Sequence, residues 1–275
     1  MSEFEADLYN MARSVEFRRV YKPFQEQLAK DVININTSPA VYVSADKTNN
    51  IYKVEVEDYD RILQDNITAN YRKTDNSIIN KINLDAKSIA EKLKLDDRIE
   101  KYPETEAFIT IKDHKSNFPN NLKCRLINPA KSNLGRVSSH IINRINQTIR
   151  IKSGLQQWRN TTAVISWFNN FPFTERSRFI TFDIVDFYPS ITENLLEDSI
   201  KFAKQWVEVD EETTAVIKHC RRSLLFSRDS AWIKKNGSLF DVTMGSYDGA
   251  EVCEMVGLFL LQDLAKLVGK NNIEL

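Results

Sequence analysis

The sequence predicts an α+β fold in which helices alternate with short β-hairpins along a chain of 275 residues. Apolar residues recur at helical spacing in several long segments, whereas other regions contain pairs of β-rich pieces around polar turns. Hydrophobic residues make up 42% of the chain and charged residues 28%, which is typical of an ordered globular protein. The length allows one large domain or two modest ones, and only seven glycines argue against a glycine-rich nucleotide-binding fold.

Residues 1–100 form the first predicted region, which is mainly helical and charged. Helical periodicity occurs in three of its segments, 15–32, 56–74 and 77–95. Segment 41–56, VYVSADKTNNIYKVEV, breaks this pattern, because two β-rich pieces flank a polar turn at Asp46–Asn50.

Residues 101–177 form the second predicted region, a basic hairpin followed by a helix. The hairpin strands are expected in EAFITIKDHK and LKCRLINPA, and the helix in GRVSSHIINRINQTIRI. From Lys112 to Arg159 the chain has ten Lys or Arg and one acid, so this segment carries a net charge of +9 in a chain of net charge zero. A solvated basic face is the ordinary explanation of a short charge run, but a run this long favours a polyanionic partner, either nucleic acid or a nucleotide triphosphate.

Residues 178–275 form the third predicted region, which begins with RFITFDIVDFYPSI (178–191) as a strand. On this strand Ile180, Phe182 and Ile184 would face inward and pack under helices, whereas Phe179, Thr181 and Asp183 would face out of an open side of the sheet. The next segment, 190–206, is expected to be a helix that begins with a capping box of Ser190 and Glu193.

Two further elements are expected before the end of the chain. Asn236–Gly237 lies between strand-like pieces and predicts a hairpin turn. The last predicted helix covers 245–269, where Asp248 can cap the helix, Glu251 can complete a capping box and Gly269 can end it.

The two aspartates of segment 178–191 predict a divalent-cation site. A carboxylate at a strand end with a second one three residues later can hold Mg²⁺, which prefers oxygen ligands and keeps several waters. Asp183 is the better ligand because the strand would fix it toward open space, and the main-chain carbonyl of Ile184 could complete the coordination sphere. The alternative for Asp186 is that it only caps the following turn.

Phe187 and Tyr188 follow these carboxylates directly. An aromatic ring just beyond a metal ligand can lie against the sugar of a nucleotide, where it would collide with a 2′-hydroxyl and so favour deoxyribonucleotides. The alternative is that both rings are core aromatics, which is the commoner fate of such residues at a strand end.

The sequence predicts an intracellular protein, in the cytoplasm or nucleus, that does not insert into a membrane. The acidic N-terminus does not resemble a signal peptide, and the longest apolar run, Met255–Leu261, is too short to span a bilayer. The three cysteines, Cys124, Cys220 and Cys253, lie far apart and suit a reducing compartment.

Several motifs resemble those of reverse transcriptases, which are RNA-directed DNA polymerases. FDIVDFYPSI resembles their first catalytic motif, where an aspartate is followed five residues later by an aromatic residue beside the sugar, as in Asp183 and Tyr188. FITIKDHKSNFPNNLKCRLINPAKS is similar to their fingers, and VTMGSYDGAEVCEMVG to their glycine-containing loop and helix. VSADKTNNIYKV is similar to an upstream motif of Penelope-like reverse transcriptases. The resemblance spans Asp46 to Leu267 and rests on the order and spacing of these motifs.

The resemblance implies a fold of fingers and partial palm behind an N-terminal helical region, with the thumb absent. It implies the following catalytic residues: Asp183 and Asp186. The implied metal ligands are Asp183 and Ile184, for Mg²⁺ or Mn²⁺. The implied nucleotide-binding residues are Arg125, Phe187, Tyr188 and Gly245, together with one lysine that accompanies Arg125, either Lys112 or Lys123. The implied contacts to a template-primer are made by Lys131, Arg136, Arg144 and Arg150.

The sequence departs from this family in its last part, because no Asp-Asp pair of a second catalytic motif follows the last predicted helix. We therefore expect template-directed synthesis from a deoxynucleoside triphosphate (dNTP) by a truncated form with weak or no activity alone. The second interpretation is a catalytically silent nucleic-acid-binding protein derived from a reverse transcriptase. The third, and least favoured, is a metal-dependent nuclease that uses Asp183 and Asp186, because His114, His140 and His219 are scattered.

Overall fold

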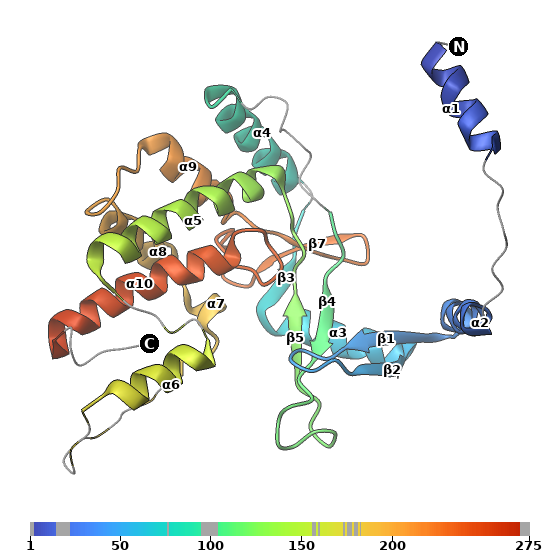
Figure 1. Cartoon of the computed structure of the whole chain (residues 1–275), viewed down its shortest axis with the longest axis horizontal. Helices are drawn as coiled ribbons and strands as arrows, with labels where there is room; N and C mark the ends of the chain where they lie inside the picture. The colour runs from blue at the N-terminus through green and yellow to red at the C-terminus, as the bar shows by residue number, and fades with distance from the viewer. Residues whose placement is uncertain are drawn as a thin grey trace.

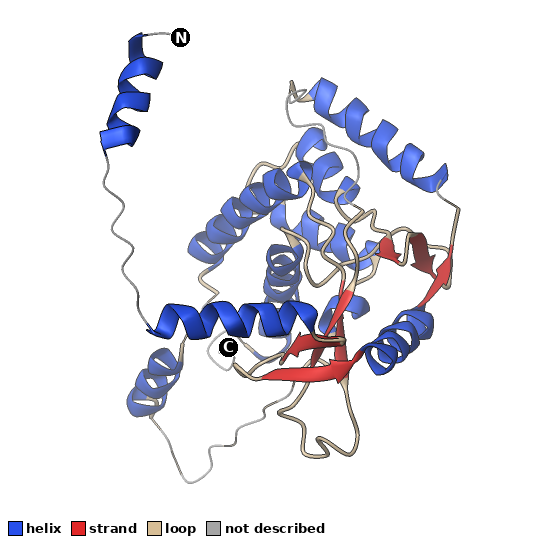
Figure 2. Ribbon diagram, turned by 90° about the vertical axis from the view of Figure 1, so that its right-hand side faces the viewer, coloured by secondary structure: helices blue, strands red, loops and turns tan. Residues whose placement is uncertain are grey.

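A computed structural model describes most of the chain, and it confirms the α+β class. The described residues are 3–14, 23–75, 77–94, 104–155, 158, 160–172, 174, 178, 181 and 183–269. Helices α5, α8, α9 and α10 gather on one side of the molecule, and the small antiparallel sheets lie toward the other side (Figure 1). Helix α1 is set apart from the remaining elements in both views (Figures 1 and 2).

The described part of the first region contains four helices and three strands. They are α1 (Glu3–Ser14), α2 (Pro23–Thr37), β1 (Ala40–Ser44), β2 (Ile51–Glu55), α3 (Val56–Asn70), β3 (Tyr71–Lys73) and α4 (Ser77–Lys92). The predicted β-rich interruption is confirmed, because β1 and β2 pair antiparallel from Ala40↔Glu55 to Ser44↔Ile51. The helix predicted over 56–74 ends earlier, since Tyr71 begins a strand.

The predicted basic hairpin is also confirmed. It consists of β4 (Phe108–Ile111) and β5 (Cys124–Ile127), which pair antiparallel with Thr110 opposite Arg125. Ala45, just after β1, forms a parallel bridge to Ile111 of β4. The two hairpins therefore share one apolar cluster, in which Val43, Ile109 and Ile111 are buried.

A three-stranded sheet in the order β3-β7-β6 joins distant parts of the chain. Its hairpin consists of β6 (Leu225–Ser227) and β7 (Ser230–Lys234), and it turns at Arg228 and Asp229, both with positive φ. The hairpin predicted at Asn236–Gly237 is therefore wrong. These residues do form a turn, but Phe240 beyond it bridges to Arg222 rather than to β7.

Glu106 explains why the hairpin turns where no Asn-Gly signal exists. Its carboxylate accepts hydrogen bonds from the backbone N–H groups of Arg228 and Asp229, at 2.9 and 3.4 Å. A long-range contact thus stabilises a turn that requires left-handed backbone, which aspartate tolerates better than most residues.

The helical side is built from α5 (Asn133–Ser153), α8 (Glu193–Ala203), α9 (Glu211–His219) and α10 (Gly249–Val268). Helix α10 packs against α5 and α8, as its apolar character predicts. Their largest shared cluster includes the buried side chains of Ile142, Leu196, Met255 and Leu258. Two shorter helices, α6 (Thr161–Asn170) and α7 (Phe187–Ser190), precede α8.

The strand predicted over residues 178–191 is contradicted for the residues that the structure describes. Arg178, Thr181, Asp183 and Ile184 lie outside any strand, Val185 and Asp186 form a turn, and α7 follows. The predicted inward facing of Ile184 is also wrong, since the residue is 45% exposed. Phe179, Ile180 and Phe182, which carry the rest of this prediction, lie outside the described residues.

Both predicted capping boxes are replaced by other contacts. Helix α8 is capped by Thr192, whose hydroxyl accepts a hydrogen bond from the Leu195 N–H, and not by Ser190. Helix α10 does begin after Asp248 and end at Gly269 (φ 87°), as predicted, but the Asp248 side chain makes no capping hydrogen bond.

The Asp248 carboxylate instead pairs with the guanidinium of Arg221, and both side chains are only 1% exposed. A buried carboxylate and a buried cation each cost several kcal/mol to desolvate, so each depends on the other. The same surroundings raise the pKa of the neighbouring Cys220 thiol well above its usual value, first through burial and then through the charge of Asp248.

We expect Asp248→Ala to lower the free energy of unfolding by about 3–5 kcal/mol, because Arg221 would be left as an uncompensated buried charge. Denaturant unfolding measures this. The matched control is Asp58→Ala, which breaks an ion pair with Arg61 whose side chains are 58% and 64% exposed; its cost should stay within about 1 kcal/mol. Equal costs for the two variants would contradict the role given to the buried pair.

Candidate nucleotide-binding site

A cavity of about 780 Å³ lies where six separate segments of the chain meet. The walls come from the α3–β3 junction, the β4–β5 hairpin, residues 186–190, the start of β6 at Leu225, the end of β7 with its turn, and residues 241–244. Its charged lining residues are Lys112, Arg125, Asp186, Lys234, Lys235 and Asp241. Two tyrosines, Tyr71 and Tyr188, contribute the aromatic part of the lining.

The β4–β5 hairpin supplies two of the predicted nucleotide-binding cations. Lys112 and Arg125 both line the cavity, whereas Lys123 is exposed and does not belong to its described lining. The backbone N–H of Lys112 donates to the carbonyl of Lys123 at 2.8 Å. This hydrogen bond extends the backbone pairing of the hairpin by one residue pair beyond β4 and β5. Of the two lysines that the sequence left as alternatives, Lys112 is thus the one beside Arg125 in the cavity.

Arg125 is held by a carboxylate from the first hairpin. Its Nη1 lies 2.6 Å from Oδ1 of Asp46, and the Asp46 side chain is only 5% exposed. Sequence analysis marked Asp46 as part of a motif but did not pair it with Arg125, because nearly eighty positions separate them along the chain.

A second aspartate, Asp113, fastens the turn of the first hairpin. Its Oδ2 accepts hydrogen bonds from Thr48 Oγ1 at 2.6 Å, Asn50 Nδ2 at 2.9 Å and the Tyr52 hydroxyl at 3.0 Å. The Thr48 hydrogen bond is the largest cause that lowers the pKa of Asp113 below its usual value. The carboxylate therefore stays ionised, and keeps its three donors, to lower pH than a free aspartate would.

Neither predicted metal ligand, Asp183 or Ile184, belongs to the described lining of the cavity, whereas the second predicted catalytic residue, Asp186, does. Asp186 lines the cavity in a left-handed conformation, with φ 50° and ψ 49°. Its side chain makes no capping hydrogen bond to α7, which argues against the alternative that it only caps the turn. Asp183 and Ile184 are exposed and do not belong to the described lining.

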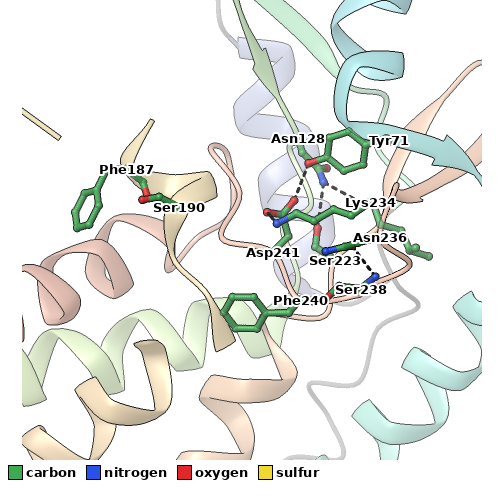
Figure 3. A network of polar contacts seen from close by, with 11 residues as sticks. Tyr71, Asn128, Phe187, Ser190, Ser223, Lys234, Asn236, Ser238, Phe240 and Asp241 are labelled. Carbon is green, nitrogen blue, oxygen red and sulfur yellow. Dashed lines mark hydrogen bonds and ion pairs between the residues drawn. The ribbon is translucent and has the colours of Figure 1, made fainter. Parts of the chain in front are cut away.

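Tyr188 and Phe187 have different surroundings. Tyr188 lines the cavity and is half-buried beside Gly249 and the Cys253 thiol. Burial raises the pKa of the Tyr188 hydroxyl, and it raises that of the Cys253 thiol to about 12. Phe187 packs against the helical core, and its ring points away from the network around Asp241 (Figure 3). Its surroundings favour the core alternative for Phe187.

Gly245, the predicted glycine of the turn, lies directly against the end of β5. Its φ is 117°, and a Cβ at this position would come 2.6 Å from the carbonyl oxygen of Asn128. The backbone N–H of Asn128 also donates to the carbonyl of Met244 at 3.0 Å. Only glycine permits this approach, so the loop before α10 forms the cavity wall together with β5.

A network of polar contacts that the sequence did not predict contributes Tyr71, Asn128, Lys234 and Asp241 to the cavity lining (Figure 3). The Tyr71 hydroxyl donates to Oδ2 of Asp241 at 2.7 Å, and Lys234 Nζ lies 2.8 Å from the other oxygen of this carboxylate. Asn128 Nδ2 donates to Ser223 Oγ at 3.1 Å and to the carbonyl of Leu224 at 3.0 Å. The only signal in the sequence was a single carboxylate within the apolar run LFDV.

The four residues predicted to contact a template-primer have unequal surroundings. Lys131 and Arg136 are exposed, and both cations lie over the ring of Tyr247, at 5.6 and 4.9 Å from its centroid. Arg144 is exposed on α5, whereas Arg150 forms an ion pair with Glu254 between α5 and α10. Their role in nucleic-acid binding stays a prediction.

The described residues contain no group of three or more His, Cys, Asp or Glu side chains arranged to hold a metal ion. Likewise, within the described part of the chain, no helix has the length and apolar character needed to cross a membrane. All three cysteines are free thiols.

Comparison of the chain with models of protein families, with curated proteins and with solved structures finds no match.

We expect Gly245→Ala to lower the free energy of unfolding by about 1–3 kcal/mol, because alanine is strained at this φ and its Cβ would collide with Asn128. The control is Gly257→Ala, since a Cβ there meets no atom within 4 Å in the middle of α10; it should stabilise by about 0.5–1 kcal/mol. Thermal and denaturant unfolding measure both. A neutral Gly245→Ala variant would contradict the close approach.

We expect Tyr71→Phe to cost about 1–3 kcal/mol of unfolding free energy, because the buried Asp241 carboxylate would lose one of its two partners. Tyr42→Phe is the control, since Tyr42 is 40% exposed on β1; its effect should stay within about 0.5 kcal/mol. Denaturant unfolding again provides the measurement, and similar costs for both variants would argue against the network.

Proposed function

We propose that this protein performs template-directed nucleotidyl transfer of the reverse-transcriptase type. In this reaction a primer 3′-hydroxyl attacks the α-phosphate of a dNTP, the new phosphodiester bond forms, and pyrophosphate leaves. The observation that carries the proposal is the cavity, in which Lys112 and Arg125 share one space with Asp186 and Tyr188. These are four of the residues that the resemblance implies for nucleotide binding and catalysis.

The cavity suits a nucleotide in size and charge. Its volume of about 780 Å³ is within the range of small-molecule sites. Lys112 and Arg125 would neutralise the triphosphate, and the planar guanidinium can donate two parallel hydrogen bonds to phosphate oxygens. Tyr188 would lie against the sugar and disfavour a 2′-hydroxyl.

The oxygen donors of this region fit Mg²⁺ or Mn²⁺. The candidates are the Asp186 carboxylate at the cavity, the nearby Asp183 carboxylate and the Ile184 carbonyl, and such ions accept one or two carboxylates together with substrate phosphates and water. When bound, the ion would polarise the phosphate and neutralise developing charge. The carboxylates and cations of the chain would orient the triphosphate for in-line attack.

The nucleic acid would lie along the exposed basic side chains before and on α5. Lys131 and Arg136 beside Tyr247, together with Arg144, offer phosphate contacts that give affinity without sequence information. Arg150 would contribute less, because Glu254 already compensates its charge.

The alternative is a catalytically silent nucleic-acid-binding protein. One observation favours it: Asp183, the carboxylate that the resemblance gives the main metal-binding role, is exposed and does not belong to the described lining of the cavity. A protein that uses only the basic residues would need neither aspartate.

Primer extension by the whole chain, with a labelled primer-template, all four dNTPs and Mg²⁺ or Mn²⁺, tests the proposal. We expect weak extension by this chain, and a fall of about 100- to 1,000-fold in Asp183→Asn and Asp186→Asn, because each removes a carboxylate that stabilises the metal-bound transition state. Asp229→Asn is the control, since Asp229 is exposed and has a positive φ like Asp186, and asparagine tolerates a positive φ. We also expect Arg125→Ala to weaken dNTP binding by about 10- to 100-fold.

The outcomes separate the two functions. Salt-sensitive binding of the primer-template, with no dNTP binding and no extension, would establish the silent alternative. Extension that survives in both aspartate variants would overturn the roles proposed for the carboxylates.

A further inference from the structure

Arg125 has two environments at once. Its guanidinium borders the cavity and its side chain is 33% exposed, while Nη1 is held 2.6 Å from the almost fully buried Asp46 carboxylate. The Nε atom of Arg125 and Oδ2 of Asp46 are buried and have no hydrogen-bond partner among the described residues. The ion pair is thus the one polar contact described for either charge.

Asp46 cannot reach a ligand in the cavity itself. Its side chain is 5% exposed, and it does not belong to the described lining. The backbone fixes it further, because the Asp46 N–H donates to the carbonyl of Ile111 at 2.8 Å and Ala45 bridges to the same residue. Any effect of Asp46 on a ligand must therefore act through Arg125.

Two aspartate side chains take part in the contacts between the first hairpin and the β4–β5 hairpin, and their partners differ. Asp113 binds its turn through Thr48, Asn50 and Tyr52, without contacting Arg125. Asp46 contacts Arg125 directly. The chain therefore offers a matched pair of aspartates at the same junction, of which only one touches the arginine.

We propose that Asp46 is a positioning residue that fixes the Arg125 guanidinium toward the cavity, so that the β1–β2 hairpin is part of the anion-binding apparatus. The inference rests on the proposed function for the identity of the anion, the triphosphate of a dNTP. A long arginine side chain that is already immobilised loses less conformational entropy when it binds a ligand. The negative charge of Asp46 acts in the opposite direction, because it weakens the attraction between Arg125 and the triphosphate. Whether Asp46→Ala weakens or tightens dNTP binding therefore shows which effect of Asp46 is larger.

The first measurement does not need a nucleotide. Phenylglyoxal modifies accessible arginines, and mass spectrometry of peptides gives the rate at each position. In the wild-type chain we expect Arg125 to react more slowly than the exposed Arg144. In Asp46→Ala the rate at Arg125 should rise to that of Arg144, whereas in Asp113→Ala it should stay low. No change at Arg125 in Asp46→Ala would overturn the inference.

The second measurement is equilibrium binding of a dNTP with Mg²⁺ to the same three proteins. We expect Asp46→Ala to weaken binding by about three- to tenfold, since Arg125 must then be ordered at the moment of binding. Asp113→Ala should change the affinity by less than about twofold, because its effect is confined to the hairpin turn. Combined with Arg125→Ala, the Asp46→Ala change should add no further loss.

These results separate the inference from the proposed function. If the wild-type chain binds no dNTP, the proposed function fails, but the phenylglyoxal rates still decide whether Asp46 immobilises Arg125. Tighter binding in Asp46→Ala, or equal weakening in Asp46→Ala and Asp113→Ala, would overturn the positioning role. Asp46→Asn, which keeps the size of the side chain and one acceptor oxygen, replaces Asp46→Ala if alanine prevents folding, and the same comparisons apply.

Discussion

The buried ion pair between Arg221 and Asp248 is the constraint on which the cavity depends. It joins the residues just after α9 to the start of α10, although a complete β-hairpin lies between them in the chain. Next to the pair, the N–H of Asp241 donates to the carbonyl of Arg221 at 2.8 Å, and Arg222 bridges to Phe240. Because neither buried charge is tolerable alone, the loop over 241–248 is held where it can meet the end of β5.

Charge compensation also explains which groups around the cavity are available to a ligand. Arg125 is paired with Asp46, and Lys234 with Asp241. Among the described residues, Lys112, Lys235 and Asp186 line the cavity without an ion pair. The unpaired lysines suit the anionic part of a ligand, and the unpaired carboxylate suits a cation that accompanies it. The paired groups are held in a fixed orientation by their partners, which for Arg125 is the orientation toward the triphosphate that we propose.

The sequence predicted the elements with strong local signals. Both N-terminal hairpins and the helices α5 and α10 follow from periodicity and turn composition. The predictions failed where a contact with a distant residue decides the local structure. Glu106 stabilises a hairpin turn at Arg228–Asp229, and the Asp248 carboxylate pairs with Arg221 and so does not cap α10. For the site, the sequence identified Arg125, Asp186 and Tyr188 as candidates. It could not identify Asp46 as the partner of Arg125, nor the contact between Tyr71 and Asp241, because these contacts join positions far apart in the chain.

The turn at Val185–Asp186 changes what the two aspartates can do together. In a continuous strand, residues 183 and 186 are an odd number of positions apart, so their side chains would point to opposite faces and could not share a ligand. The turn and the left-handed backbone of Asp186 remove this restriction, because they redirect the chain between the two carboxylates. The strand predicted from the apolar residues would thus have been a poor framework for a shared cation. The local structure that contradicts this strand is more compatible with the metal site that the same residues predict.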